Sequence, residues 1–156
     1  MTAPGPGVYR ALLCRAGGQL CALRLEDVVE TMRPLDVEQL PGLPPFVRGL
    51  AVVRGTPIPV VDLRILLGAP EGRPPARFVT VRAGARRLAL AVEEVLGVQP
   101  LPVSAQEDLP PLLGEVSAGA VETLGAADQQ LLIVLRAARL VPEEIWSALA
   151  DRGAGR

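Results

Sequence analysis

The amino-acid sequence predicts a mainly β protein, in which two five-stranded β-barrels pack over a shared apolar core and a short α-helix closes the chain. Three observations support this prediction. Hydrophobic residues make up 49% of the 156 residues, enough to bury the core of one domain. The apolar runs are short, rich in β-branched residues and bounded by glycines, as strands and turns are. One such stretch occurs twice, which indicates two copies of one structural unit.

The repeat has an offset of 67 residues and eight identities in the 22 positions from 10 to 31. Antiparallel sheets of about five strands commonly close into barrels that remove exposed edges, and one copy alone would bury little surface. We therefore expect barrels at about 8–68 and 76–136 within a single domain 8–150, with flexible ends at 1–7 and 151–156. The identical residues are Arg10, Arg15, Ala16, Gly17, Ala22, Leu23, Glu26 and Val28, which recur as Arg77, Arg82, Ala83, Gly84, Ala89, Leu90, Glu93 and Val95.

The first copy opens with a predicted hairpin of two strands, 8–16 and 19–25, joined at Gly17-Gly18. Two glycines are a strong signal for a two-residue turn. In this register paired positions sum to 35, so Cys14 faces Cys21 across the hairpin. Two small apolar core residues are favoured here over a redox pair. In the second copy, strands 77–83 and 86–92 join at Gly84-Ala85 in the same way.

A second hairpin follows in the stretch from Phe46 to Gly68. The run 49–53 suits a buried strand, and Gly55-Thr56 is expected to turn the chain into a returning strand. Pro57 and Pro59 carry no N–H, so that strand should lie at an edge or break its ladder there. Asp62 is expected to cap one turn of helix that Gly68 ends.

The remaining segments follow from turn signals and periodicity. The C-terminal helix, predicted at 142–150, begins with proline and acidic residues. Ile145, Leu149 and Trp146 are expected to dock this helix on a barrel. The predicted segments are a turn at 26–28, a strand at 29–33, a proline-rich loop at 34–45, a linker at 69–76, a loop at 101–118, strands at 119–125 and 129–135 around a turn at 126–128, and the helix at 142–150.

Composition excludes most enzyme and cofactor chemistry. The chain has no histidine, and all 16 basic residues are arginine. It therefore lacks a Ser-His-Asp triad, a phospho-accepting histidine, a Schiff-base lysine and a P-loop lysine. Two cysteines are too few for a zinc site, so we expect no metal and no cofactor. A net charge of −1 gives no general attraction for nucleic acid, and the absence of a long apolar run or a signal peptide predicts a cytoplasmic protein without membrane insertion.

The motifs together resemble the CheW family of chemotaxis adaptor proteins, over about residues 9–149. The resemblance rests on Val28-Val29-Glu30 before a proline-containing loop, then Gly49, Arg54-Gly55, and the run Ile58-Pro59-Val60-Val61-Asp62-Leu63. In the second half, Leu90-Ala91-Val92-Glu93-Glu94-Val95-Leu96-Gly97-Val98 is similar to a further segment of the family.

The resemblance implies two intertwined SH3-like barrels and a non-catalytic adaptor recruited to receptor arrays. It implies binding to the cytoplasmic tip of a chemoreceptor and to the regulatory domain of a CheA-type histidine kinase. In the family, receptor contact uses the groove between the barrels, and kinase contact uses apolar barrel surfaces. The partner-binding residues expected here are Val28, Glu30, Thr31, Gly49, Val53 and Arg54.

Alternative roles remain open for several of these residues. Arg54 could pair with carboxylates of a partner or form an internal salt bridge with Glu30 or Asp62. Asp62 is expected to be a helix cap rather than a binding residue. Structural roles are expected for Gly17, Gly55, Gly84 and Pro59. At the level of function, the alternatives are a divergent scaffold of a non-flagellar pathway that binds one partner, and a barrel that binds a small molecule.

Overall fold

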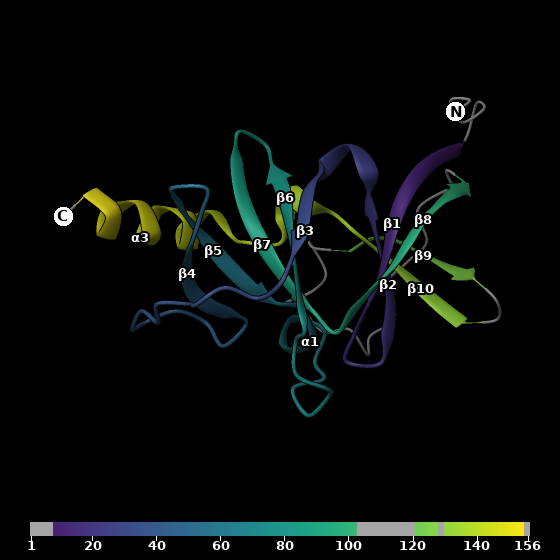
Figure 1. Cartoon of the computed structure of the whole chain (residues 1–156), viewed down its shortest axis with the longest axis horizontal. Coiled ribbons are helices and arrows are strands. Elements are labelled where there is room, and N and C mark those ends of the chain that lie inside the picture. Colours follow the sequence, from purple (N-terminus) through teal and green to yellow (C-terminus); the bar gives the residue numbers. More distant parts are fainter. Residues whose placement is uncertain (1–7, 103–120, 128–129, 155–156) are drawn as a thin grey trace.

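The computed structural model describes residues 8–102, 121–127 and 130–154, and these form two five-stranded sheets with short helices (Figure 1). Predictions for residues 1–7 and 103–118 fall outside the described residues. The first sheet has the order β8-β1-β2-β10-β9 and the second β3-β6-β7-β5-β4. The strands are β1 Val8–Ala16, β2 Gln19–Arg24, β3 Val28–Met32, β4 Val47–Val53, β5 Thr56–Asp62, β6 Arg77–Ala83, β7 Arg86–Val92, β8 Glu94–Pro102, β9 Val121–Ala127 and β10 Gln130–Leu135.

The prediction that each barrel is one continuous segment, 8–68 or 76–136, is wrong. The β1–β2 hairpin pairs with β8 and β10 from the second copy, while β6 and β7 pair with β3 and β5 from the first. The chain crosses from one sheet to the other at the 3-10 helix η1, Leu25–Asp27, and again at Glu93 between β7 and β8. The two sheets are equivalent under the repeat, so the repeat is real but the strands are exchanged between its copies. This is the intertwined arrangement of SH3-like barrels.

The first hairpin has the predicted register. Cys14 lies opposite Cys21 and Ala16 opposite Gln19, so Gly17 and Gly18 form the turn, with φ of 57° and 78°. Positive φ at both central residues matches the right-handed twist of the flanking strands and favours glycine. Gly84 has the same role between β6 and β7, with φ of 68°.

Alternation along the strands produces three apolar clusters. On β1, Leu12 and Cys14 face the core shared by the two sheets, while Ala11 and Leu13 face the interior of their own barrel. The equivalent interior of the second barrel is a smaller cluster of its own. The shared core draws on both sheets, which confirms the predicted packing of the barrels. Its fully buried large side chains include Leu23, Leu63, Leu88, Leu90, Ile133, Leu135 and Leu140.

The C-terminal helix α3 spans Glu143–Ala154 and is longer than predicted. The expected end at 150 and the frayed tail from 151 are wrong for the residues up to Ala154, which continue the helix although Gly153 is a poor helix former. Leu149 is buried, and Ile145 and Trp146 pack partly buried against the shared core, as expected. The other helical segments are α1 Leu63–Leu66 and the 3-10 helix η3 Ala137–Arg139.

Three other boundaries differ from the prediction by a few residues. β3 begins at Val28 and ends at Met32, one residue earlier at each end than expected. β8 continues to Pro102, so the loop expected from 101 begins later. β9 continues to Ala127 through residues expected to turn, because its pairing with β10 extends to Gln130.

Candidate partner-binding site

The β4–β5 hairpin turns at Arg54-Gly55 rather than at the predicted Gly55-Thr56. Val53 pairs with Thr56, which leaves Arg54 and Gly55 as the two turn residues, with φ of 49° and 82°. A positive φ is common for glycine and uncommon for arginine. The hairpin thus holds the arginine in a left-handed conformation at its tip, with its side chain 78% exposed.

β5 is an internal strand of the second sheet, lying between β4 and β7, so the alternative of an edge position is wrong. Its parallel pairing with β7 begins at Val60 and continues to Asp62. Pro57 and Pro59 precede that pairing, and they pair with Val52 and Leu50 of β4 in an unbroken register. The ladder with β4 is not broken at these prolines, so the second predicted alternative is also wrong. The prolines are tolerated because residues 56–59 of β5 pair with a strand on one side only.

Arg54 forms a bidentate ion pair with Glu30 of β3. Its Nε lies 3.1 Å from both carboxylate oxygens, and its Nη2 lies 2.9 Å from Oε2. Thr80 fixes the backbone of Glu30, because its Oγ accepts from the Glu30 N–H at 3.2 Å and donates to the Glu30 carbonyl at 3.3 Å. The hydrogen bond and charge of Glu30 raise the pKa of Arg54. Since β3 and β4 are opposite edges of the sheet, this pair ties one edge to the hairpin at the other.

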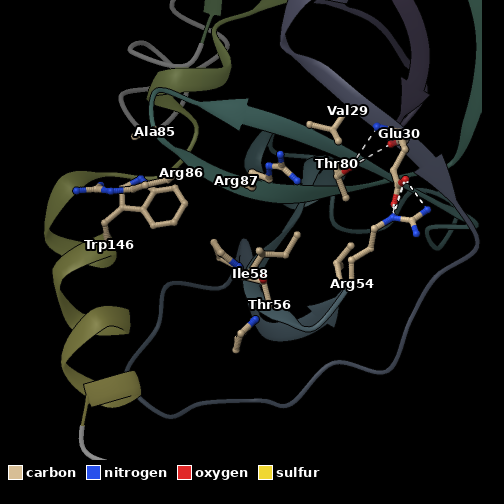
Figure 2. Close-up of a pocket in the computed structure, with 13 residues that line it drawn as sticks. Val29, Glu30, Arg54, Thr56, Ile58, Thr80, Ala85, Arg86, Arg87 and Trp146 are labelled. Atoms are coloured by element: carbon tan, nitrogen blue, oxygen red, sulfur yellow. Dashed lines mark hydrogen bonds and ion pairs between the residues drawn. The ribbon is translucent and has the colours of Figure 1, made fainter.

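The Glu30–Arg54 pair lies at one side of a concavity of about 430 Å³ (Figure 2). Every lining residue belongs to the second sheet, its hairpin turns or α3, so this concavity is not the space between the two barrels. We call it the barrel mouth. Figure 2 shows Trp146 and Arg86 at the side away from Glu30 and Arg54. The lining residues are Val29, Glu30, Val53, Arg54, Thr56, Pro57, Ile58, Pro59, Thr80, Ala85, Arg86, Arg87 and Trp146.

The structure brings Glu30, Val53 and Arg54 together, but it does not place the other predicted partner-binding residues at the barrel mouth. Val28 is half-buried and packs against the shared core. Thr31 is exposed on β3 without lining the concavity. Gly49 is buried with φ of 143°, and a Cβ there would collide with the carbonyl oxygen of Glu38. Gly49 therefore allows the backbone of β4 to approach the backbone at Glu38 closely.

Asp62 is not the helix cap that the sequence predicts. Its side chain is fully buried and makes no capping hydrogen bond. Instead its Oδ2 accepts from Nε and Nη2 of Arg48 at 3.0 and 2.6 Å, and Nε of Arg64 lies 3.4 Å away. Arg64 also donates to the Gly72 carbonyl at 2.7 Å. Asp62 therefore joins β4, the start of α1 and the following linker, and it does not pair with Arg54.

Sequence reasoning missed the far side of the mouth. Arg86 forms a bidentate pair with Glu143 at 3.0 and 2.7 Å, and its guanidinium lies 5.0 Å from the centre of the Trp146 ring. This is within the range of a cation–π contact. The pair raises the pKa of Arg86 and lowers the pKa of Glu143, chiefly through their hydrogen bonds. Because Arg86 and Glu143 are 57 positions apart, no local pattern could have revealed this contact.

The buried thiols have no reactive surroundings. Burial raises the pKa of Cys14 to about 12, and burial followed by the neighbouring Cys14 raises the pKa of Cys21. A thiol with a raised pKa is a poor nucleophile at neutral pH. Among the described residues, no three His, Cys, Asp or Glu side chains gather as metal ligands would. Every helix in the same part of the chain is too short or too polar to span a membrane.

Comparison with known proteins identifies the family. Residues 10–144 match the model of the CheW-like domain. The chain belongs to the CheW-like domain family. The resemblance seen in the sequence is therefore confirmed.

Two similar proteins and one solved structure agree with this assignment. Protein FrzA of Myxococcus xanthus is 30% identical over 143 residues, which cover 87% of each chain. Protein PilI of Pseudomonas aeruginosa is 36% identical over 101 residues, which cover 63% of this chain and 57% of PilI. The crystal structure of the scaffolding protein TtCheW from Thermoanaerobacter tengcongensis superposes with a TM-score of 0.69 and 24% identity, over 82% of this chain and 88% of that one. This superposition confirms the fold.

Proposed function

We propose that this CheW-like protein is a non-catalytic adaptor that couples the cytoplasmic tip of a chemoreceptor to the regulatory domain of a CheA-type histidine kinase. The observation that carries the proposal is the family match over residues 10–144. The adaptor acts in the cytoplasm, where receptor arrays recruit it, and it needs no cofactor.

The geometry of the barrel mouth supports a docking role. Arg54 is 78% exposed at a hairpin tip, and its carboxylate partner Glu30 is 27% exposed. Bidentate pairing through Nε and Nη2 fixes the direction of the guanidinium, and Nη1 is not among the groups that bind Glu30. A rigid exposed arginine of this kind suits recognition of a partner carboxylate, since arginine is enriched at interface hot spots. The internal salt bridge and the partner contact are therefore compatible roles of one side chain.

The polar groups of the mouth do not favour a small-molecule site. Ligand pockets commonly aim a few polar groups at one point inside an apolar cavity. Here Glu30 pairs with Arg54, Arg86 pairs with Glu143, and Thr80 bonds the backbone of Glu30. These two ion pairs lie at opposite sides of the mouth, so their charged groups do not converge on one point. This arrangement suits binding of a protein surface better than binding of a small molecule.

Separate binding experiments test the two halves of the proposal. Receptor-tip fragments and the kinase regulatory domain, taken from the organism that encodes this chain, are each mixed with the purified protein at tens of micromolar. We expect co-sedimentation with the first and a stable complex in size-exclusion chromatography with the second. Binding to one partner alone would reduce the adaptor to a one-partner scaffold, and binding to neither would refute the proposal.

A further inference from the structure

Two arginines lie directly opposite each other on the inner face of the second sheet, and one of them, Arg87, lines the barrel mouth. In the β6–β7 hairpin, Arg82 lies directly opposite Arg87, and Thr80 lies opposite Ala89. Directly opposite residues of an antiparallel pair share a face of the sheet, and like charges at such positions are destabilising. Arg82 donates to the backbone carbonyl of Glu26 at 3.0 Å, which neutralises no charge.

Arg87 is the arginine of this pair that lines the mouth. Within the described residues, neither Arg82 nor Arg87 has a carboxylate partner, whereas Arg54 and Arg86 each have one. Figure 2 shows Arg87 between Trp146 on one side and Thr80 on the other. Of the three arginines that line the mouth, Arg54 pairs with Glu30 and Arg86 with Glu143, so the positive charge of Arg87 is the one that no carboxylate of the described residues neutralises.

Apolar side chains surround this charge. Val29, Val53, Ile58 and Trp146 line the same concavity. A partner that inserts only an anion would leave these groups in water, and a purely apolar partner would desolvate Arg87 without pairing it. The complementary surface is therefore a carboxylate flanked by apolar side chains.

From this arrangement we infer that the barrel mouth is the docking site of an acidic, partly apolar segment of a partner protein, and that Arg87 pairs with its carboxylate. The inference rests on the proposed adaptor function, because it specifies the chemistry of the partner. The segment binds through its side chains and does not add a strand to β5. The residues of β5 that line the mouth include Pro57 and Pro59, which have no N–H to donate to an added strand.

The test compares Arg87→Glu with the matched control Arg77→Glu. Arg77 is an exposed residue at the other end of the same hairpin, about 17 Å from Arg82 along β6, and it makes the same charge change outside the mouth. Labelled receptor-tip fragment is titrated with the wild type and both variants, and binding is followed by fluorescence anisotropy. We expect Arg87→Glu to weaken binding about tenfold or more, and Arg77→Glu to leave it within about twofold.

Two further measurements separate docking from folding. Arg87→Glu removes the repulsion from Arg82, so its melting temperature should equal or exceed that of the wild type. A short probe peptide of glutamate, leucine and alanine should bind the wild type more tightly than the same peptide with glutamine in place of glutamate, and more weakly as salt is added.

The outcomes distinguish this inference from the proposed function. If the receptor fragment binds the wild type and both variants equally, Arg87 is not part of the site and the inference is overturned, while the adaptor proposal stands. If the receptor fragment does not bind but the acidic peptide binds in an Arg87-dependent way, the acidic site stands and the receptor is the wrong partner. If neither probe binds the wild type, the inference fails.

Discussion

Replacing Asp62 by asparagine separates two explanations of this residue. Asparagine is as good a helix cap as aspartate, so a capping role predicts almost no change in stability. An ion pair with Arg48 and Arg64 predicts a clear loss, because the substitution removes the charge and keeps the shape. The structure supports the ion pair, since Asp62 is fully buried and makes no capping bond.

The size of the loss follows from burial and geometry. Breaking a fully buried pair costs about 3–5 kcal/mol, because one charge is left without a partner. Here the Arg48 side chain is 39% exposed and can recover water, and asparagine still offers an acceptor oxygen. We therefore expect Asp62→Asn to lower the free energy of unfolding by about 2 kcal/mol. For a chain of this length that corresponds to a melting temperature lower by about 4–8 °C.

Urea unfolding at pH 7 measures this loss, and a double-mutant cycle with Arg48→Met assigns it. If the two side chains act as a pair, the single losses should not add, and the coupling energy should be about 1–2 kcal/mol. A loss below about 0.5 kcal/mol, without coupling to Arg48, would refute the ion pair and restore the capping role.

Four other substitutions test further parts of the structure. Gly49→Ala should lower the free energy of unfolding in urea by about 3 kcal/mol, because the φ of 143° is strained for alanine and the new Cβ collides with Glu38. Gly55→Ala, at φ of 82° with open space around it, should lower it by about 1 kcal/mol. Equal losses for the two variants would contradict the close approach of Gly49 to Glu38. Burial raises the pKa of Cys14 from 9.0 to about 12, so its contribution to stability is complete below pH 9 and falls between pH 9 and 12; Cys14→Ala should flatten this decline, and an unchanged slope would argue against a buried thiol. Arg54→Glu should abolish receptor-tip binding while circular dichroism stays unchanged, and unaltered affinity would remove Arg54 from the site.

Local signals in the sequence predicted the hairpins well. Gly17-Gly18 fixed both the turn and the facing of Cys14 and Cys21, because a two-residue loop allows one register. At the second hairpin the same reasoning placed the turn one residue too late. It assigned the turn to Gly55-Thr56, since arginine rarely adopts the positive φ that Arg54 has in the structure.

Contacts between distant residues could not be predicted. The repeat showed two copies of one unit, but self-similarity does not say which strands pair, and the exchange of β3 to β5 for β8 to β10 depends on long-range pairing. Asp62 has the local pattern of a cap, and its partner Arg48 becomes its neighbour only when β4 pairs with β5. The predicted hairpin register already places Arg87 opposite Arg82, but the mouth that Arg87 lines forms only when β3, β5 and α3 come together around β7.

Co-sedimentation of three components tests the adaptor function most directly. Assembled receptor-tip fragments are pelleted with the kinase regulatory domain, in the presence and absence of this protein. We expect the kinase domain to enter the pellet only when the protein is added, and Arg54→Glu to abolish that recruitment. A kinase domain that pellets to the same extent with and without the protein would contradict the role of a scaffold that joins the two.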